Sequence, residues 1–268
     1  MSLLKWKIEQ YKNRKLSILD NYIENLISTY SNINKSPDMD LKSPLELSET
    51  NRENLYSYLK TYDILLKKYA LKGIMQGETD FEKAFSIMNW LTESTYYNGQ
   101  QLSYSNMLPD DSDAILHYSY KKPFRYAINC RYKAIVFTDI LIALGFKAYP
   151  VVMYDCDGFG NHLTVHLYLE DIKKWVLFDP SFNTYFTDKK NTPLDAYEIK
   201  ANFLKGENPI ICGYNFNGTK KCFDIYKYEF IKKNLAEFST WSDNSQVGRK
   251  KTMNIYKTRK TFDCKLPE

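Results

Sequence analysis

Hydrophobic residues recur every three to four positions along residues 134–144, which is the repeat of a helix that buries one face. Gly145 follows this stretch and is a residue type at which helices commonly end. The pattern predicts a helix that begins at Cys130. The side chain of Cys130 would then lie at a helix N-terminus.

A different repeat follows, in which apolar and polar residues alternate along residues 162–169. Strict alternation is the pattern of a half-buried strand, so a strand is expected to begin at His162. A second strand, residues 175–178, closes with Asp179 and is ended by Pro180, which cannot continue a hydrogen-bonded ladder. The short polar stretch between the two strands fits a hairpin, which would bring Asp179 back toward His162.

Helical patterns also occur elsewhere. Thr79 and Glu82 form a capping-box pattern ahead of an apolar run that includes Trp90. Further helices are predicted for residues 3–30, 50–71 (ended by Gly73), 113–118 and 226–238. Together these elements predict three parts: an N-terminal helical extension packed on the core, the core itself and a basic C-terminal tail, at residues 1–75, 76–245 and 246–268.

Three predicted element ends carry groups that suit acyl-transfer chemistry. A helix N-terminus favours a thiolate over a thiol at Cys130, although a buried structural cysteine would fit the same position. A carboxylate at Asp179 could accept a hydrogen bond from one nitrogen of His162 and leave the other to take the thiol proton. The alternative is that Asp179 and Pro180 only end a strand.

The order of these residues resembles the transglutaminase-like superfamily, within the papain-like cysteine enzymes. Its pattern is a Cys that opens a helix ending in an apolar-Gly pair, then a strand that begins with His, then a Trp-containing strand that ends in Asp-Pro. The matching positions are Cys130, Leu144 with Gly145, His162, Trp175, and Asp179 with Pro180.

The resemblance covers roughly residues 80–190. It implies an α+β fold in which the helix that carries the Cys packs on an antiparallel sheet, with extra N-terminal helices added. It also implies that Cys130 is the nucleophile, His162 the general base and acid, and Asp179 the orienting carboxylate. One departure is His166, which stands where the family often has Glu and leaves the role of that strand face open.

Other candidate site residues follow less directly. The backbone N–H of Cys130 is the expected first donor of an oxyanion hole. Gln100 and Gln101 are candidates for the second donor, because papain-like enzymes use a Gln upstream of the Cys. Asn129, next to the nucleophile, and Trp90 are candidates for the oxyanion site or the substrate rim, although a Trp at helical spacing also fits a core. The polar, tyrosine-rich residues 93–126 are expected to form that rim.

Composition and charge limit the classes of partner that the protein is expected to bind. Residues 247–268 contain seven Lys and Arg against two acidic residues, a net charge of +5 that equals that of the whole chain. Such a tail can attract an acidic carrier protein, but it is more often simply solvated, and no nucleic acid is expected. No apolar run is long enough to cross a membrane and no signal-type segment is present, so a cytoplasmic protein without a membrane partner is expected.

No metal or organic cofactor is expected. The five cysteines are scattered and lack CxxC spacing, so neither a zinc site nor a disulfide framework is signalled. Residues 155–158 lack the ligand spacing of a calcium loop.

Three functions share this fold. In the first, Cys130 takes an acyl group from a small-molecule or carrier-bound thioester or amide, and an amine acceptor resolves the acyl-enzyme to an amide. In the second, water resolves it, as in a peptidase or amidase. In the third, the fold binds without catalysis. The first is favoured, because members that resemble this core include amide synthases of bacterial thiotemplated pathways.

Overall fold

The computed structural model describes residues 62–99, 108, 111–154, 161–207, 209–212, 235, 237–241 and 252–254. Contacts divide the chain into two units, residues 1–60 and 61–268, and the described residues all belong to the second. The predicted helix over residues 3–30 and most of that over 50–71 therefore lie outside the described residues.

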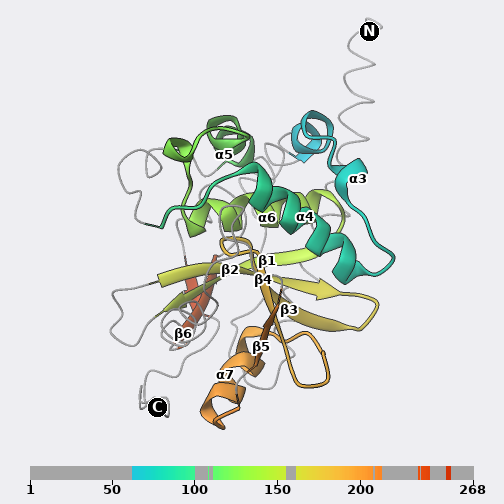
Figure 1. Cartoon of the computed structure of the whole chain (residues 1–268), viewed down its shortest axis with the longest axis vertical. Helices are drawn as coiled ribbons and strands as arrows, with labels where there is room; N and C mark the ends of the chain where they lie inside the picture. Colours follow the sequence, from blue (N-terminus) through green and yellow to red (C-terminus); the bar gives the residue numbers. More distant parts are fainter. Residues whose placement is uncertain are drawn as a thin grey trace, which may run out of the picture. The chain divides into compact units, whose positions relative to one another are not determined.

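One antiparallel sheet organises the described residues (Figure 1). Its strand order is β5-β4-β3-β2-β1-β6-β7, so β2 lies near its middle and the chain returns to the β1 side with β6. The strands are β1 (Lys147–Tyr154), β2 (Asn161–Leu169), β3 (Lys174–Asp179), β4 (Thr184–Thr187), β5 (Ile210–Cys212), β6 (Glu237–Trp241) and β7 (Thr252–Asn254).

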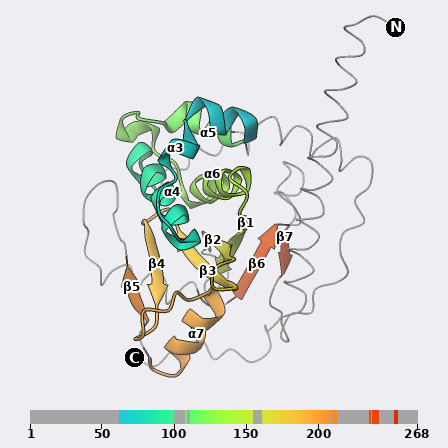
Figure 2. The ribbon, with the colours of Figure 1, turned by 90° about the vertical axis from the view of Figure 1, so that its right-hand side faces the viewer.

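Helices cover both faces of this sheet. Helix α6 packs directly on β1 and β2, α4 and α5 pack on α6, and α7 lies across the opposite face (Figure 2). The predicted α+β fold, with the helix that carries the Cys packed on an antiparallel sheet, is confirmed. The bounds are α3 (Leu71–Ile74), α4 (Asp80–Ser94), α5 (Ser112–Ser119), the 3₁₀ helix η2 (Phe124–Tyr126), α6 (Cys130–Ala143) and α7 (Ala196–Leu204).

Helix α6 begins at Cys130, as its sequence pattern predicts. The side-chain oxygen of Asn129 accepts a hydrogen bond from the backbone N–H of Tyr132 and so caps the helix. Gly145, just beyond the end, adopts φ 95°, a left-handed conformation that suits a residue without a side chain. Residues 132–142 are all buried, so the helix is enclosed on all sides and not only on the one face that its sequence pattern predicts.

The local sequence also fixes the other elements near the site. Helix α4 carries the predicted capping box between Thr79 and Glu82, and the predicted hairpin joins β2 to β3 with Leu169 opposite Lys174. Asp179 ends β3 as predicted.

Three expectations need correction. Residues 62–68 are helical, but left-handed Ala70 at φ 51° breaks the helix before Gly73, which lies inside α3. The predicted helix over residues 226–238 is wrong at its end, because Glu237–Trp241 forms β6 against β1. Within the predicted tail, Thr252–Asn254 forms β7 and extends the sheet.

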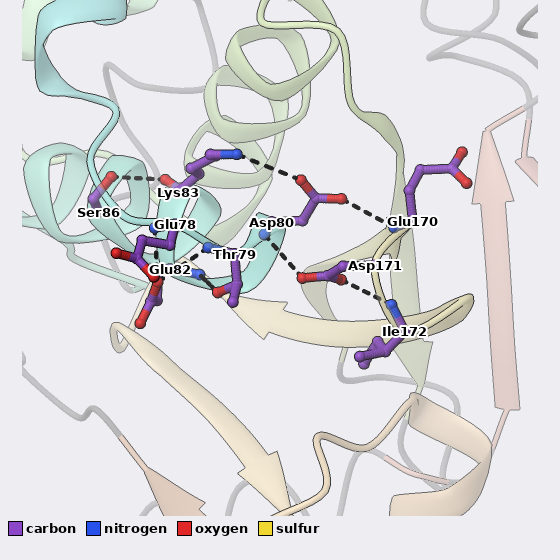
Figure 3. A network of polar contacts seen from close by, with 9 residues as sticks. All are labelled: Glu78, Thr79, Asp80, Glu82, Lys83, Ser86, Glu170, Asp171 and Ile172. Atoms are coloured by element: carbon purple, nitrogen blue, oxygen red, sulfur yellow. Dashed lines mark hydrogen bonds and ion pairs between the residues drawn. The ribbon is translucent and has the colours of Figure 1, made fainter.

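Polar contacts tie the start of α4 to the β2–β3 hairpin (Figure 3). The side chain of Asp80 accepts a hydrogen bond from the backbone N–H of Glu170, and the side chain of Asp171 accepts one from the backbone N–H of Asp80, both at 3.1 Å. The carboxylate of Asp171 also accepts from the N–H of Ile172 at 2.9 Å. These contacts fix the end of the hairpin that lies away from Asp179, and a carboxylate at a helix N-terminus is favourable.

His166 connects the middle of the sheet to α7. Its Nε2 accepts a hydrogen bond from the backbone N–H of Ala196, the first residue of α7, at 3.1 Å. The proton therefore resides on Nδ1, which donates to the hydroxyl of Tyr149 at 2.7 Å. Burial lowers the pKa of His166 to about 3, and the charge of Glu198 offsets only part of this effect. His166 is thus a neutral residue that holds α7 on the sheet.

This state of His166 predicts a pH-dependent stability. The unfolded chain binds a proton at His166 below pH 6.5, whereas the folded chain does not until the pH approaches about 3. Stability is therefore complete above the unfolded pKa and is lost as the pH falls. From pH 7 to pH 5 the wild type should lose about 2 kcal/mol more than His166→Gln, measured by urea unfolding. Equal losses in both proteins would contradict this assignment.

Candidate active site

Cys130 lies where the N-terminus of α6 meets strand β2. Its side chain is partly exposed, and the backbone N–H of Leu163 in β2 donates a hydrogen bond to its sulfur. The ladder between β2 and β3 reaches only to Val165 opposite Phe178, so β3 does not cover this part of β2. The end of β2 is thereby left to contact the nucleophile.

His162 and Asp179 form a buried pair beside Cys130. Nε2 of His162 lies 2.7 Å from the carboxylate oxygen Oδ2 of Asp179, and both side chains have no exposed surface. The second oxygen of Asp179 accepts a hydrogen bond from the backbone N–H of Ser181 at 2.9 Å, which fixes the carboxylate. His162 also interacts with the Cys130 side chain, and because Nε2 is directed at Asp179, Nδ1 is the nitrogen left to exchange a proton with the thiol.

The electrostatics of the pair favour a charged site. Burial alone would lower the pKa of His162, but the charge and hydrogen bond of Asp179, together with Cys130, outweigh it and raise the pKa to about 10. Burial would raise the pKa of Cys130, but the hydrogen bond and charge of His162 and the N–H of Leu163 lower it overall. Both shifts favour a thiolate beside an imidazolium, and a thiolate is the form of cysteine that attacks carbonyl carbons.

Tyr97 is a site residue that the sequence did not single out. Its side chain is 7% exposed, and burial, with the charges of Cys130 and Asp179, raises its pKa, so the hydroxyl keeps its proton. Its ring contacts Phe182 at 5.2 Å, and Phe182 contacts the ring of His162 at 5.7 Å. In a stretch so rich in tyrosine, no local signal distinguishes Tyr97 from its neighbours.

The backbone around Tyr97 is joined to the residues that lead into α6. The N–H of Ile128 donates to the carbonyl of Tyr96 at 2.9 Å, and the N–H of Asn98 donates to the carbonyl of Ile128 at 3.0 Å. Tyr97 and Ile128 thus form a parallel bridge two residues before Cys130. This pairing fixes Tyr97 beside the nucleophile.

Lys133 is a second residue that the sequence did not single out. It lies one turn after Cys130 on α6 and is fully buried. Its amine donates to the backbone carbonyl of Thr95 at 2.8 Å and lies 3.4 Å from that of Leu91, both at the C-terminal end of α4.

The structure brings Cys130, His162 and Asp179 together and places the weaker candidates elsewhere or in other roles. The side chain of Asn129 caps α6. Trp90 packs against Tyr69 and Tyr120, at 6.0 and 5.8 Å between ring centroids, so it is part of an aromatic cluster. The candidates Gln100 and Gln101 lie outside the described residues.

The described residues contain neither a metal-binding cluster nor a membrane-spanning helix. Within them, no group of three or more His, Cys, Asp and Glu side chains is arranged to hold a metal ion. None of the helices in this part of the chain is long and apolar enough to span a membrane.

Part of the chain is similar to a known protein family and to two solved structures. No curated protein matches the sequence. Two solved structures match at 18% identity: a proposed cysteine protease from Cytophaga hutchinsonii (TM-score 0.34, 50% of this chain and 43% of that one) and a TGase (TM-score 0.32, 67% and 42%). The match thus spans less than half of either structure. The family model of the transglutaminase-like superfamily matches residues 67–180, which run from before α4 to the residue after Asp179. This part of the chain is similar to the transglutaminase-like superfamily.

Proposed function

We propose that the protein is a cysteine-dependent acyltransferase that forms an amide bond, with Cys130 as nucleophile, His162 as general acid and base, and Asp179 as the orienting carboxylate. The observation that carries the proposal is the buried 2.7 Å hydrogen bond between His162 and Asp179, beside a cysteine at the first position of α6. The family supports the coarser statement that the protein is of the cysteine protease and transglutaminase type.

In the first half-reaction, the Cys130 thiolate attacks the carbonyl carbon of a thioester or amide. A tetrahedral intermediate forms, and its collapse breaks the bond between that carbon and the leaving sulfur or nitrogen. The His162 imidazolium gives its proton to the leaving group. The product is an acyl-enzyme with a thioester bond to Cys130, and His162 is left neutral.

In the second half-reaction, an amine attacks the carbonyl carbon of this thioester. His162 accepts a proton from the amine, the bond to the Cys130 sulfur breaks, and the amide leaves. The thiolate and the imidazolium are thereby restored, and Asp179 keeps the imidazole oriented throughout. If water attacks in place of the amine, the same residues carry out hydrolysis.

We assign the negatively charged oxygen of the intermediate to two donors. The first is the backbone N–H of Cys130, at the N-terminus of α6, where the helix dipole also favours negative charge. The second is the hydroxyl of Tyr97, which is buried, protonated and under the influence of the Cys130 charge. A rigid donor in a buried site is an effective way to stabilise developing charge.

The choice of an amine over water is supported by exposed aromatic side chains in the segments that precede Cys130. Tyr96 and Phe124 are 39% and 50% exposed, and their rings pack edge to face at 5.7 Å. Tyr96 belongs to the segment that pairs with Ile128, just before Cys130. Exposed aromatic surface suits an organic acyl chain or amine better than water. An acidic carrier protein that delivers the acyl group remains part of the proposal, through the basic C-terminal residues.

The acyl-enzyme is the direct test. Intact-mass measurements after mixing the protein with a panel of simple acyl thioesters should detect an adduct on Cys130, because it is the one of the two described cysteines that interacts with a histidine. The adduct should be lost in Cys130→Ala and kept in Cys212→Ala, since Cys212 is a second half-exposed cysteine without a histidine partner in its described contacts. A chase with amines should discharge the adduct faster than water does.

If amines discharge the acyl adduct no faster than water does, the protein is a hydrolase and not a transferase. No adduct with any thioester, in protein shown to be folded, would favour a catalytically silent fold.

The role of Tyr97 gives a second test. Tyr97→Phe removes the hydroxyl and keeps the ring that packs on Phe182. Loss of one donor to the developing charge should lower kcat by about 100-fold with little change in KM. The matched control is Tyr96→Phe, which makes the same change in the exposed neighbour. An unchanged kcat in Tyr97→Phe would show that its hydroxyl has no part in the reaction.

A further inference from the structure

Lys133 is a buried amine whose position packing alone does not explain. It has no exposed surface, and its described hydrogen-bond partners are the backbone carbonyls of Thr95 and Leu91. Burial of an amine costs free energy unless the charge is compensated, whereas an apolar side chain of similar size would fill the same space without that cost. The neighbouring residues Ala134, Ile135 and Val136 are all apolar and fully buried.

Lys133 connects α6 to the segment that pairs with the start of the same helix, because its amine donates to the carbonyl of Thr95, at the end of α4. Two residues further along the chain, Tyr97 forms a backbone bridge with Ile128, which lies two residues before Cys130, the first residue of α6. The contact of Lys133 is thus the side-chain contact in this arrangement, and the other connections are made by the backbone.

The charges of the triad give Lys133 a second effect. A Cys130 thiolate, a His162 imidazolium and an Asp179 carboxylate together carry one excess negative charge in a buried site. Burial lowers the pKa of Lys133 to about 7, and the charge of Asp179 acts in the opposite direction. A protonated Lys133 therefore offsets the excess charge from within the same helix as the nucleophile.

We propose that Lys133 is a positioning residue for the nucleophile, which holds the segment with Tyr97 against the first turn of α6 and balances the negative charge of the triad. The proposal rests on the proposed function for its effect on turnover. Its effect on the state of the Cys130 thiol is independent of which acyl group or acceptor the protein uses.

The test compares Lys133→Met with the wild type and with Lys200→Met. Lys200 is another buried lysine, which lies in α7 over the ring of Phe238, so its replacement controls for the loss of any buried amine. The first readout is the rate of alkylation of Cys130 by iodoacetamide as a function of pH. Thermal unfolding reports whether each variant is folded.

In Lys133→Met, the pH midpoint of alkylation should rise by about one unit, because a nearby cation no longer favours the thiolate. Alkylation at pH values below both midpoints should be about tenfold slower than in the wild type. The unfolding temperature should change little, because the lower cost of burying an apolar side chain is offset by the loss of the hydrogen bonds to the carbonyls of Thr95 and Leu91. Turnover should show a lower kcat with an unchanged KM, and Lys200→Met should match the wild type in alkylation and turnover.

A folded Lys133→Met protein with the wild-type alkylation profile and kcat would overturn the proposal and leave Lys133 a packing residue. If Lys133→Met does not fold, Lys133→Gln decides, because its amide can still donate to a carbonyl but carries no charge. A wild-type alkylation profile in Lys133→Gln would overturn the charge-balancing role. Failure of the proposed function appears separately, as the absence of an acyl-enzyme in wild-type protein whose Cys130 is still alkylated readily.

Discussion

The buried hydrogen bond between His162 and Asp179 is the interaction on which the site depends. Two such side chains, without exposed surface, are tolerated in a protein interior only when each is fully bonded. The carboxylate meets this condition through His162 and the backbone of Ser181, and Nε2 of the imidazole meets it through Asp179, while Cys130 acts on the same ring. The orientation of the imidazole therefore follows from the end of β3, and the state of the thiol follows from the imidazole.

The fold supplies this geometry by rigid elements. The antiparallel pairing of β2 and β3 brings the end of one strand next to the beginning of the other, while the polar contacts between α4 and the hairpin fix the opposite end. Helix α6, buried along most of its length on β1 and β2, presents its N-terminus to the uncovered end of β2. The nucleophile and its base thus come from two elements that pack on each other.

The two histidines of β2 have pKa values shifted in opposite directions, because their surroundings differ. His162 is bonded to a carboxylate and a thiol, and its pKa is raised. His166 is buried between a tyrosine hydroxyl and the N–H of Ala196, and its pKa is lowered. The strand pattern predicted both positions but not this division, because Tyr149 and α7 reach His166 from distant parts of the chain.

Local patterns were sufficient for α6, β2, β3 and the order of Cys130, His162 and Asp179, because each element has a clear repeat and a definite end. They were insufficient for β1, whose Pro150 obscures a strand; the ladder to β6 begins only at Val152, beyond the proline. Tyr97 and Lys133 could not be predicted, since their roles arise from contacts across the fold.

The interaction between Cys130 and His162 is tested most directly by the ultraviolet absorbance of the Cys130 thiolate, measured against pH as the difference between the wild type and Cys130→Ala. A thiolate signal should persist below the ordinary thiol pKa of about 8.5 and should be lost over the same pH range in His162→Ala. A signal that appears only at or above the ordinary value, with or without His162, would contradict the central claim that Cys130 and His162 form an ion pair.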